Sequence, residues 1–119
     1  IPIYGNGKQI RDWLYVIDHC EAIKLVIKKG HVGNTYNIGG DNEIQNLKLV
    51  KIILKIYSEL DNKKKYKDLI KLIKFVEDRK GHDIRYSIDS SKIKNELKWQ
   101  PSSDFYNNLK KTIQWYLRK

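Results

Sequence analysis

The sequence predicts an α/β fold in which short strands alternate with about four helices. Three observations support this prediction: short β-prone runs recur along the chain, apolar residues at helical spacing follow them, and glycines or cap-forming residues separate the two. A chain of 119 residues with 40% hydrophobic and 32% charged residues suits at most one ordered domain. Because the strands are few and short, we expect them to complete a sheet that begins in preceding polypeptide.

The N-terminal half alternates between the two kinds of element. The expected elements are, in order, a strand over residues 10–16, a helix capped by Asp18 that runs to Lys29, a strand over residues 35–38, and a helix over residues 47–60 capped by Asn46. The first helix carries one apolar stripe, which we expect to face the core. Its members are Val16, Cys20, Ile23 and Ile27.

The C-terminal half begins with a polar loop and ends in two helices. The expected elements are a loop over residues 61–67, a strand over 72–76, a shorter strand over 86–88, a helix capped by Ser90 or Ser91 that ends near Leu97, and a last helix capped by Ser102 or Ser103. Trp99 and Pro101 separate the two helices, because a residue before proline is restricted to extended backbone. The apolar stripe of the last helix is Phe105, Leu109, Ile113 and Tyr116.

Several classes of protein are disfavoured by composition. No apolar run approaches the roughly 20 residues of a membrane span, so we expect no membrane association. One cysteine, Cys20, excludes an internal disulfide framework and a cysteine-based zinc cluster, and His19, His31 and His82 lack ligand spacing. We expect a cytoplasmic protein without a metal site. The chain contains no Met and opens with Ile1, which favours a piece of something longer that lacks its N-terminal part.

The net charge of +10 suggests nucleic acid or an anionic ligand as partner. Lysine supplies 20 of the 24 basic residues and is scattered beside 17 Ile and 9 Asn, all of which share AT-rich codons, so we expect no nucleic-acid partner. Arg11, Arg79 and Arg85 instead lie in non-helical segments. The guanidinium fork matches phosphate oxygens better than an ammonium does. Arg11 and Arg79 therefore either grip an anion or form structural salt bridges with the adjacent Asp12 and Asp78.

Motifs for cofactor binding and catalysis are missing. A dinucleotide fingerprint needs Gly-x-Gly-x-x-Gly between a strand and a helix, but Gly5 and Gly7 are followed by Ile10 where the third glycine belongs. Two Tyr-x-x-x-Lys matches occur, at residues 4–8 and 106–110, but about one is expected by chance from 8 Tyr and 20 Lys, and we interpret neither as a catalytic pair. The groups that remain for an anion are arginine forks and the free N–H groups at a helix start near Asn46, which is equally suited to be a plain cap.

Four segments together resemble the C-terminal portion of dTDP-glucose 4,6-dehydratases, which are extended short-chain dehydrogenases/reductases. They are PIYGNGKQIRDWLYVIDH (residues 2–19), TYNIGGDNEIQNL (35–47), DRKGHDIRYSID (78–89) and ELKWQPSSDF with TIQWYL (96–117). The resemblance implies an incomplete Rossmann-type protein: residues 1–119 form the C-terminal sugar-nucleotide-binding region, and the N-terminal NAD-binding domain is absent. It also implies a homodimer for the complete enzyme.

The resemblance also implies a binding site for the dTDP-sugar. Its residues are Pro2, Ile3 and Tyr4 beside the nucleotide, Arg11 and Asn46 at the diphosphate, and the closing loop of Asp78, Arg79, Lys80, Gly81 and His82. Three positions depart from the family pattern. Lys80 replaces a proline, which frees φ and adds a charge, Asp41 stands where histidine is common, and Lys48 where aspartate is frequent.

In the complete enzyme, the family reaction converts dTDP-glucose to dTDP-4-keto-6-deoxyglucose for dTDP-rhamnose and surface polysaccharide. NAD oxidises C4, water leaves across C5 and C6, and hydride returns to C6. The family's NAD loop, its Tyr-x-x-x-Lys pair and its acid–base residues all precede this segment, so we expect substrate binding here without catalysis. Two alternatives remain: a fragment of another nucleotide-sugar epimerase or decarboxylase, and a small basic nucleic-acid-binding protein.

Overall fold

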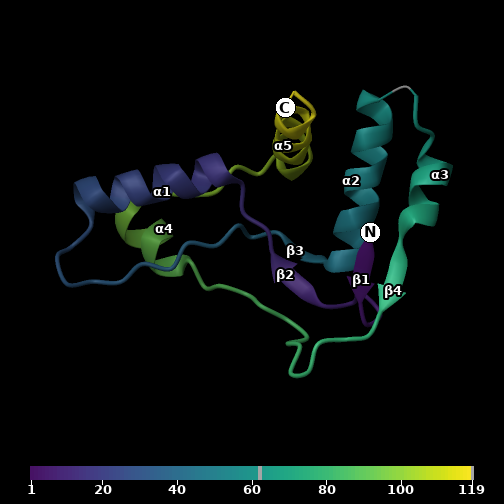
Figure 1. The fold of residues 1–119 in the computed structure, drawn as a ribbon. Helices are drawn as coiled ribbons and strands as arrows, with labels where there is room; N and C mark the ends of the chain where they lie inside the picture. Colours follow the sequence, from purple (N-terminus) through teal and green to yellow (C-terminus); the bar gives the residue numbers. More distant parts are fainter. Residues whose placement is uncertain (62, 119) are drawn as a thin grey trace.

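The computed structural model describes residues 1–61 and 63–118, and shows a mixed α/β arrangement with five α-helices among them (Figure 1). The strands are β1 (Pro2–Tyr4), β2 (Ile10–Asp12), β3 (Glu43–Gln45) and β4 (Lys74–Val76); the helices are α1 (Val16–Lys29), α2 (Asn46–Leu60), α3 (Tyr66–Leu69), α4 (Ser91–Leu97) and α5 (Phe105–Leu117), with a 3-10 turn over Ile70–Leu72. None of these helices is long and apolar enough to cross a bilayer, judged over the described residues.

The strands form two separate pairs. β1 runs parallel to β4 with Ile3 opposite Phe75, and β2 runs antiparallel to β3 with Arg11 opposite Ile44. A parallel bridge from Ile10 to Arg85 adds the chain after β4 to the free edge of β2. The pairings of β2 thus bring together three stretches that are distant in sequence: β2 itself, β3 and the segment at Arg85.

Two of the expected strands are wrong and two are shorter than expected. Residues 35–38 form no strand, since no strand partner for them exists in the described part of the chain, and their Tyr36 and Ile38 pack against the α1–α4 core. Residues 86–88 form no strand either; the nearest pairing is the isolated bridge of Arg85 with Ile10. The strand expected over residues 10–16 ends at Asp12, whose carboxylate accepts hydrogen bonds from the backbone N–H groups of Gly40 (2.8 Å) and Asn42 (2.9 Å). The strand expected over 72–76 forms as β4 but begins only at Lys74, because Leu72 belongs to the preceding 3-10 turn.

The helices lie where the sequence predicts them, but three expected caps are wrong. Asp18 sits inside the first turn of α1 and accepts a hydrogen bond from the Ser102 N–H (3.0 Å). Asn46 is the first residue of α2 and Gln45 is its N-cap. Asp104, in place of Ser102 or Ser103, caps α5 by accepting from the Asn107 N–H (3.2 Å).

Two further expectations concern loops and caps in the second half. The cap position of α4 is Ser90, as predicted, although its hydroxyl makes no capping bond. The loop expected over residues 61–67 is interrupted by α3, which begins at Tyr66, and residue 62 of that loop lies outside the described residues. The helix count is therefore one higher than expected.

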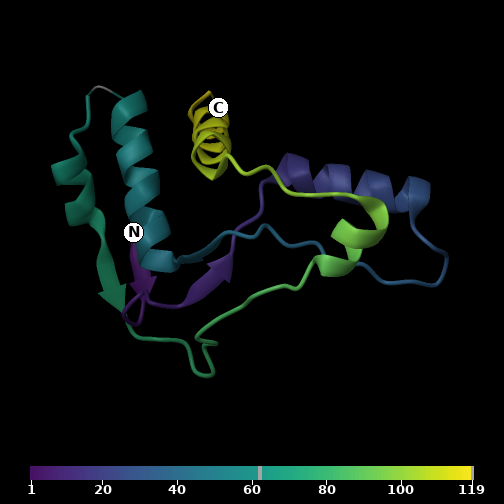
Figure 2. The ribbon, with the colours of Figure 1, turned by 180° about the vertical axis from the view of Figure 1, so that it is seen from behind.

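Two small cores hold these elements together. Ala22 of α1 packs with Ile93, Leu97 and Trp99, partly covered by the extended residues 35–38. The second core lies between α2, α3 and α5, and its buried members are Leu49, Leu54, Ile56, Leu69 and Ile113. Figures 1 and 2 show α1 and α4 as an arm that leaves the lobe formed by α2, α3, β1 and β4.

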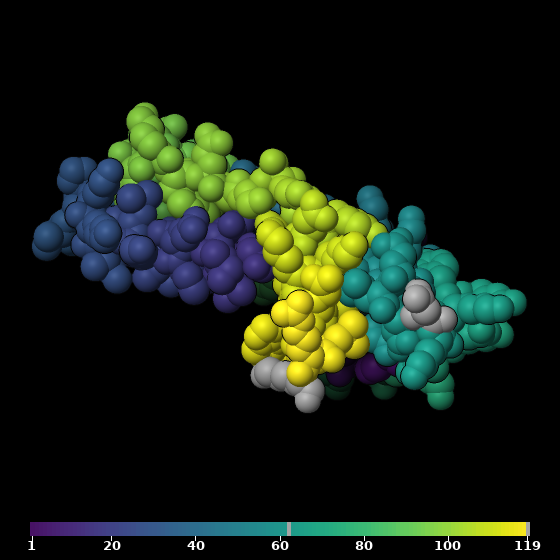
Figure 3. All heavy atoms as spheres, turned by 90° about the horizontal axis from the view of Figure 1, so that it is seen from above, coloured from purple at the N-terminus to yellow at the C-terminus, as the bar shows by residue number. Residues whose placement is uncertain are grey.

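The stripe of α1 that the sequence predicts to be inward is exposed. Ala22 is the buried residue of α1, while Val16, Ile23 and Ile27 face solvent, with Ile27 80% exposed. The arm also makes the chain extended: its radius of gyration is 17.0 Å, against about 13.5 Å expected for a compact domain of this length. Figure 3 shows α5, in yellow, between the arm and the lobe. The described chain thus leaves one side of α1 without a covering layer.

The turn between β1 and β2 yields a stability prediction. Gly7 has φ of +68°, and a Cβ there would lie 2.7 Å from Ile3 Cγ2 and 2.8 Å from Leu47 Cβ, whereas at Gly81 (φ +69°) a Cβ would meet nothing within 4 Å. We expect Gly81→Ala to lower the free energy of unfolding by about 1–2 kcal/mol through the left-handed backbone alone. Gly7→Ala should add a further loss of about 1–3 kcal/mol from overpacking. Urea denaturation measures both, and equal losses would contradict the packing assigned to Gly7.

Candidate functional site

Two guanidinium groups lie on the faces of tyrosine rings. The Cζ atom of Arg79 is 4.1 Å from the centre of the Tyr4 ring, and that of Arg11 is 4.6 Å from the centre of the Tyr86 ring. Attraction between a cation and an aromatic face holds the guanidinium plane without using its N–H groups. Both groups are therefore fixed in orientation while donors at their edges remain for a ligand.

Arg11 projects from β2 and is half-buried. Its Nη1 donates to the Ile10 carbonyl (2.6 Å) and its Nη2 to the Asp83 carbonyl (3.1 Å). A guanidinium has five N–H donors, so most are not used by these two bonds. Within residues 1–61 and 63–118, Arg11 has no carboxylate partner and the guanidinium of Arg79 has no hydrogen-bond partner. The salt bridges that the sequence allowed with Asp12 and Asp78 are not formed.

The loop that carries Arg79 is held by Asp78. One carboxylate oxygen accepts from Gln9 Nε2 (3.0 Å), and the other accepts from the Arg79 N–H (2.9 Å) and lies 2.6 Å from His82 Nδ1. The bond with His82, followed by that with the Arg79 backbone, lowers the pKa of Asp78. Gly5 allows this approach, because a Cβ there would lie 2.4 Å from the Asp78 carboxylate.

The other residues expected in the site are spread around the two arginines. Asn46 donates its backbone N–H to the Gln9 carbonyl (2.9 Å), at the end of the β2–β3 ladder that carries Arg11. Tyr4 stacks under Arg79, whereas Ile3 is buried beneath the turn. The remaining expected residues, Pro2, Lys80 and Gly81, are exposed.

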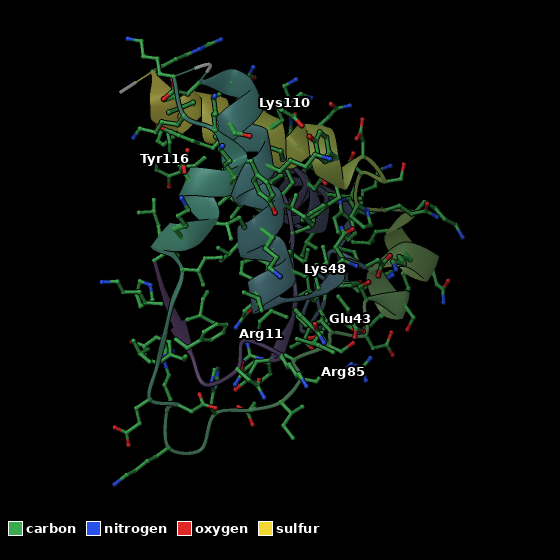
Figure 4. The ribbon with its side chains drawn as sticks, turned by 90° about the vertical axis from the view of Figure 1, so that its right-hand side faces the viewer. Arg11, Glu43, Lys48, Arg85, Lys110 and Tyr116 are labelled. Atoms are coloured by element: carbon green, nitrogen blue, oxygen red, sulfur yellow. The ribbon has the colours of Figure 1, made fainter. Side chains whose placement is uncertain are left out.

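A clamp that the sequence reasoning missed lies beside Arg11. Arg85 donates to both carboxylate oxygens of Glu43, from Nε at 2.6 Å and from Nη2 at 2.7 Å, and the Ser87 hydroxyl donates to the same carboxylate at 2.6 Å. Figure 4 shows Glu43 and Arg85 close to Arg11, at the end of the molecule opposite Lys110 and Tyr116. The bond from Arg85, and then that from Ser87, lower the pKa of Glu43 from 4.5 to about 2. The only sequence signal was an arginine in a lysine-rich chain.

A concave region whose lining includes neither Arg11 nor Arg79 lies beside α5. This hollow of about 280 Å³ is mainly apolar and is bounded by Trp13, Tyr15, Leu49 and Phe105 among others. Its lining includes no Arg, Lys or His. It therefore offers no positive charge to a phosphate, and the candidate anion-binding groups are the two stacked arginines.

Comparison with known proteins points to one family. The family model described as GDP-mannose 4,6 dehydratase matches residues 1–112. The dTDP-glucose 4,6-dehydratase of Escherichia coli is 52% identical over 119 residues, covering 98% of this chain and 33% of the relative. The chain thus spans about a third of the length of the curated relatives it matches.

Solved structures show the same relationship. The dTDP-glucose 4,6-dehydratase of Bacillus anthracis in complex with NAD superposes with a TM-score of 0.82 at 44% identity, over 99% of this chain and 34% of that one. The enzyme from Streptomyces venezuelae with NAD and TYD bound gives a TM-score of 0.84 at 37% identity, over 100% and 34%. The arrangement of helices and short strands is therefore that of part of these structures.

The clamp yields a prediction about pH. Because the folded-state pKa of Glu43 lies below its usual value of 4.5, its contribution to stability is present above pH 4.5 and is lost as the pH falls towards 2. In a carbon-detected NMR titration we expect the Glu43 carboxylate to titrate near pH 2. Arg85→Gln should raise that pKa strongly, Ser87→Ala less, and Arg118→Gln not at all. A midpoint near 4.5 in the unmodified chain would contradict the clamp.

Proposed function

The chain belongs to the GDP-mannose 4,6 dehydratase family, and we propose that it is the part of a dTDP-glucose 4,6-dehydratase that binds the nucleotide diphosphate of the substrate. The observation that carries the proposal is the pair of guanidinium groups, each laid on a tyrosine ring with edge donors unused. The 52% and 48% identity to two dTDP-glucose 4,6-dehydratases supports dTDP-glucose as the proposed substrate.

The proposed contacts divide by chemistry. Arg11, Arg79 and the amide of Asn46 donate hydrogen bonds to phosphate oxygens, since a guanidinium fork and an amide are matched to them. Asp78 and His82 hold the loop that carries Arg79. The ten proposed residues are Pro2, Ile3, Tyr4, Arg11, Asn46, Asp78, Arg79, Lys80, Gly81 and His82. Ile3 contributes by supporting the turn from below, because its own side chain is buried.

NAD is bound in the solved relatives, but the described residues do not fit its diphosphate. A dinucleotide cradle needs an open glycine turn that leads into a helix N-terminus. The turn at Gly7 is filled by the side chains of Ile3 and Leu47. Gly40 is also closely packed, because a Cβ atom on it would lie 2.3 Å from the Trp13 carbonyl oxygen. We therefore place NAD, and the hydride chemistry, on polypeptide outside this chain.

We further propose that this chain is the C-terminal region of the enzyme and that the remaining two-thirds covers the outer side of α1. The exposed stripe, the extended residues 35–38 and the large radius of gyration all support a missing layer. A helix that is apolar on two sides is normally buried on both. Self-association is less suited to this role, because the net charge of +10 opposes pairing of two copies.

Titration calorimetry with dTDP tests the binding proposal. Arg11→Ala and Arg79→Ala should each weaken dTDP binding by about tenfold to a hundredfold, the cost of a lost charge-assisted hydrogen bond. Arg118→Ala, which removes the same charge at the end of α5, should change binding little. Thymidine, which lacks the diphosphate, should bind weakly to all variants.

Two results would overturn the binding proposal. One is wild-type affinity for dTDP in the Arg11→Ala chain. The other is tight, strongly salt-dependent binding of a DNA duplex without binding of dTDP, which the nucleic-acid alternative predicts.

The proposed covering layer is tested at Ile27. We expect Ile27→Lys to change the free energy of unfolding by no more than about 0.5 kcal/mol, since the side chain faces solvent, and to reduce binding of a hydrophobic dye. Ile93→Ala, in the core on the other side of α1, should cost about 2–5 kcal/mol.

Co-purification with the complementary two-thirds of the Escherichia coli relative should be lost in Ile27→Lys. Unchanged co-purification would show that this side of α1 is not the contact.

A further inference from the structure

We infer that Tyr86 is a positioning residue that holds the Arg11 guanidinium for the diphosphate, and that the Glu43–Arg85 clamp holds Tyr86 in place. The inference deepens the proposed function and rests on it. It is drawn from three sets of contacts: the backbone pairing of residues 84–86 with β2, the clamp on one face of that pairing, and the ring stack on the other.

Residues 84–86 run beside β2 and are joined to Ile10 by an isolated parallel bridge. The Ile10 N–H donates to the Ile84 carbonyl (2.8 Å), and the Tyr86 N–H donates to the Ile10 carbonyl (3.0 Å). The same carbonyl accepts from Arg11 Nη1 (2.6 Å). The Ile10 carbonyl therefore binds both the backbone of Tyr86 and the Arg11 guanidinium that lies over the Tyr86 ring.

Strand geometry places the clamp and the stack on opposite faces. Arg85 is paired with Ile10, and Glu43 is paired with Asp12, so both lie on one face of β2. Alternation then puts Arg11 and Tyr86 on the other face, where their contact is observed. The clamp thus ties the segment of Tyr86 to β3 on one face of β2, and the ring stack with Arg11 lies on the other.

Tyr86 and Asp83 enclose the guanidinium on two sides. The ring covers its face, and the Asp83 carbonyl accepts from Nη2 at one edge (3.1 Å). The Tyr86 hydroxyl donates to the Asp83 carboxylate, which joins the two residues to each other. This arrangement leaves the guanidinium with a fixed plane and unused donors. Fixing a binding group before the ligand arrives lowers the entropy lost on binding.

A purely structural role for the ring fits the contacts less well. Tyr86 is 56% exposed and belongs to neither core, so its ring is not needed to fill space. Arg85 is likewise exposed, and a surface ion pair by itself stabilises little. The contact that both serve is the one with Arg11.

The test compares Tyr86→Leu with Tyr86→Phe in the full chain. Removing the ring should weaken dTDP and inorganic pyrophosphate binding about two- to fivefold, the usual strength of an exposed cation–aromatic contact. Tyr86→Phe keeps the ring and should restore most of the affinity. Tyr116→Leu removes another exposed tyrosine, on α5 and distant from Arg11 (Figure 4), and should have no effect.

A spectroscopic readout separates positioning from stability. In 1H–15N NMR, the Tyr86 ring should shift the Arg11 Nε–H signal through its ring current. That shift should vanish in Tyr86→Leu, persist in Tyr86→Phe and decrease in Glu43→Gln, with circular dichroism showing that each variant folds.

Two outcomes are distinguishable. Absence of dTDP binding by the wild-type chain overturns the proposed function. An unchanged Arg11 signal in Tyr86→Leu, or unchanged pyrophosphate affinity in that variant when the wild type binds, overturns the role of Tyr86.

Discussion

The hydrogen bonds of the Ile10 backbone hold the candidate site together. Its N–H and carbonyl groups bind residues 84–86, and the neighbouring residues of β2 pair with β3. Segments near positions 10, 45 and 85 therefore meet without a large sheet. Because short strands are weak by themselves, side-chain bonds complete the assembly: the Glu43–Arg85 clamp on one side and the bond from Gln9 to Asp78 on the other.

The sequence predicted the chemistry of the site better than its geometry. The scarcity of arginine in a lysine-rich chain drew attention to Arg11 and Arg79, and in the described chain each guanidinium lies over a tyrosine ring and forms no salt bridge with the adjacent aspartate. Which aromatic ring lies under each guanidinium depends on contacts between segments about 75 residues apart. No local pattern carries that information, so Tyr86 and the clamp of Arg85 were missed.

The errors in the predicted fold have two physical causes. Caps were misplaced by a few residues because several polar side chains compete for the same N–H groups, as Ser102, Ser103 and Asp104 do before α5. The other cause is non-local. Residues 35–38 have strand composition, but a strand needs a partner, and the described chain supplies none. The α1 stripe fails in the same way, since periodicity identifies an apolar face without saying which polypeptide covers it.

The proposed anion site and the uncovered side of α1 lie on different parts of the chain. Arg11, Asn46 and the loop after β4 are linked by hydrogen bonds through β2 and the neighbouring Gln9, all within the described residues. The outer side of α1 lies on the arm, and nothing in the described chain packs against it. A substitution on the arm therefore leaves the arginine stacks intact, and loss of a stack leaves the arm unchanged. Contacts within the chain thus build the framework that holds the two arginines, whereas the outer face of α1 has no covering element among the described residues.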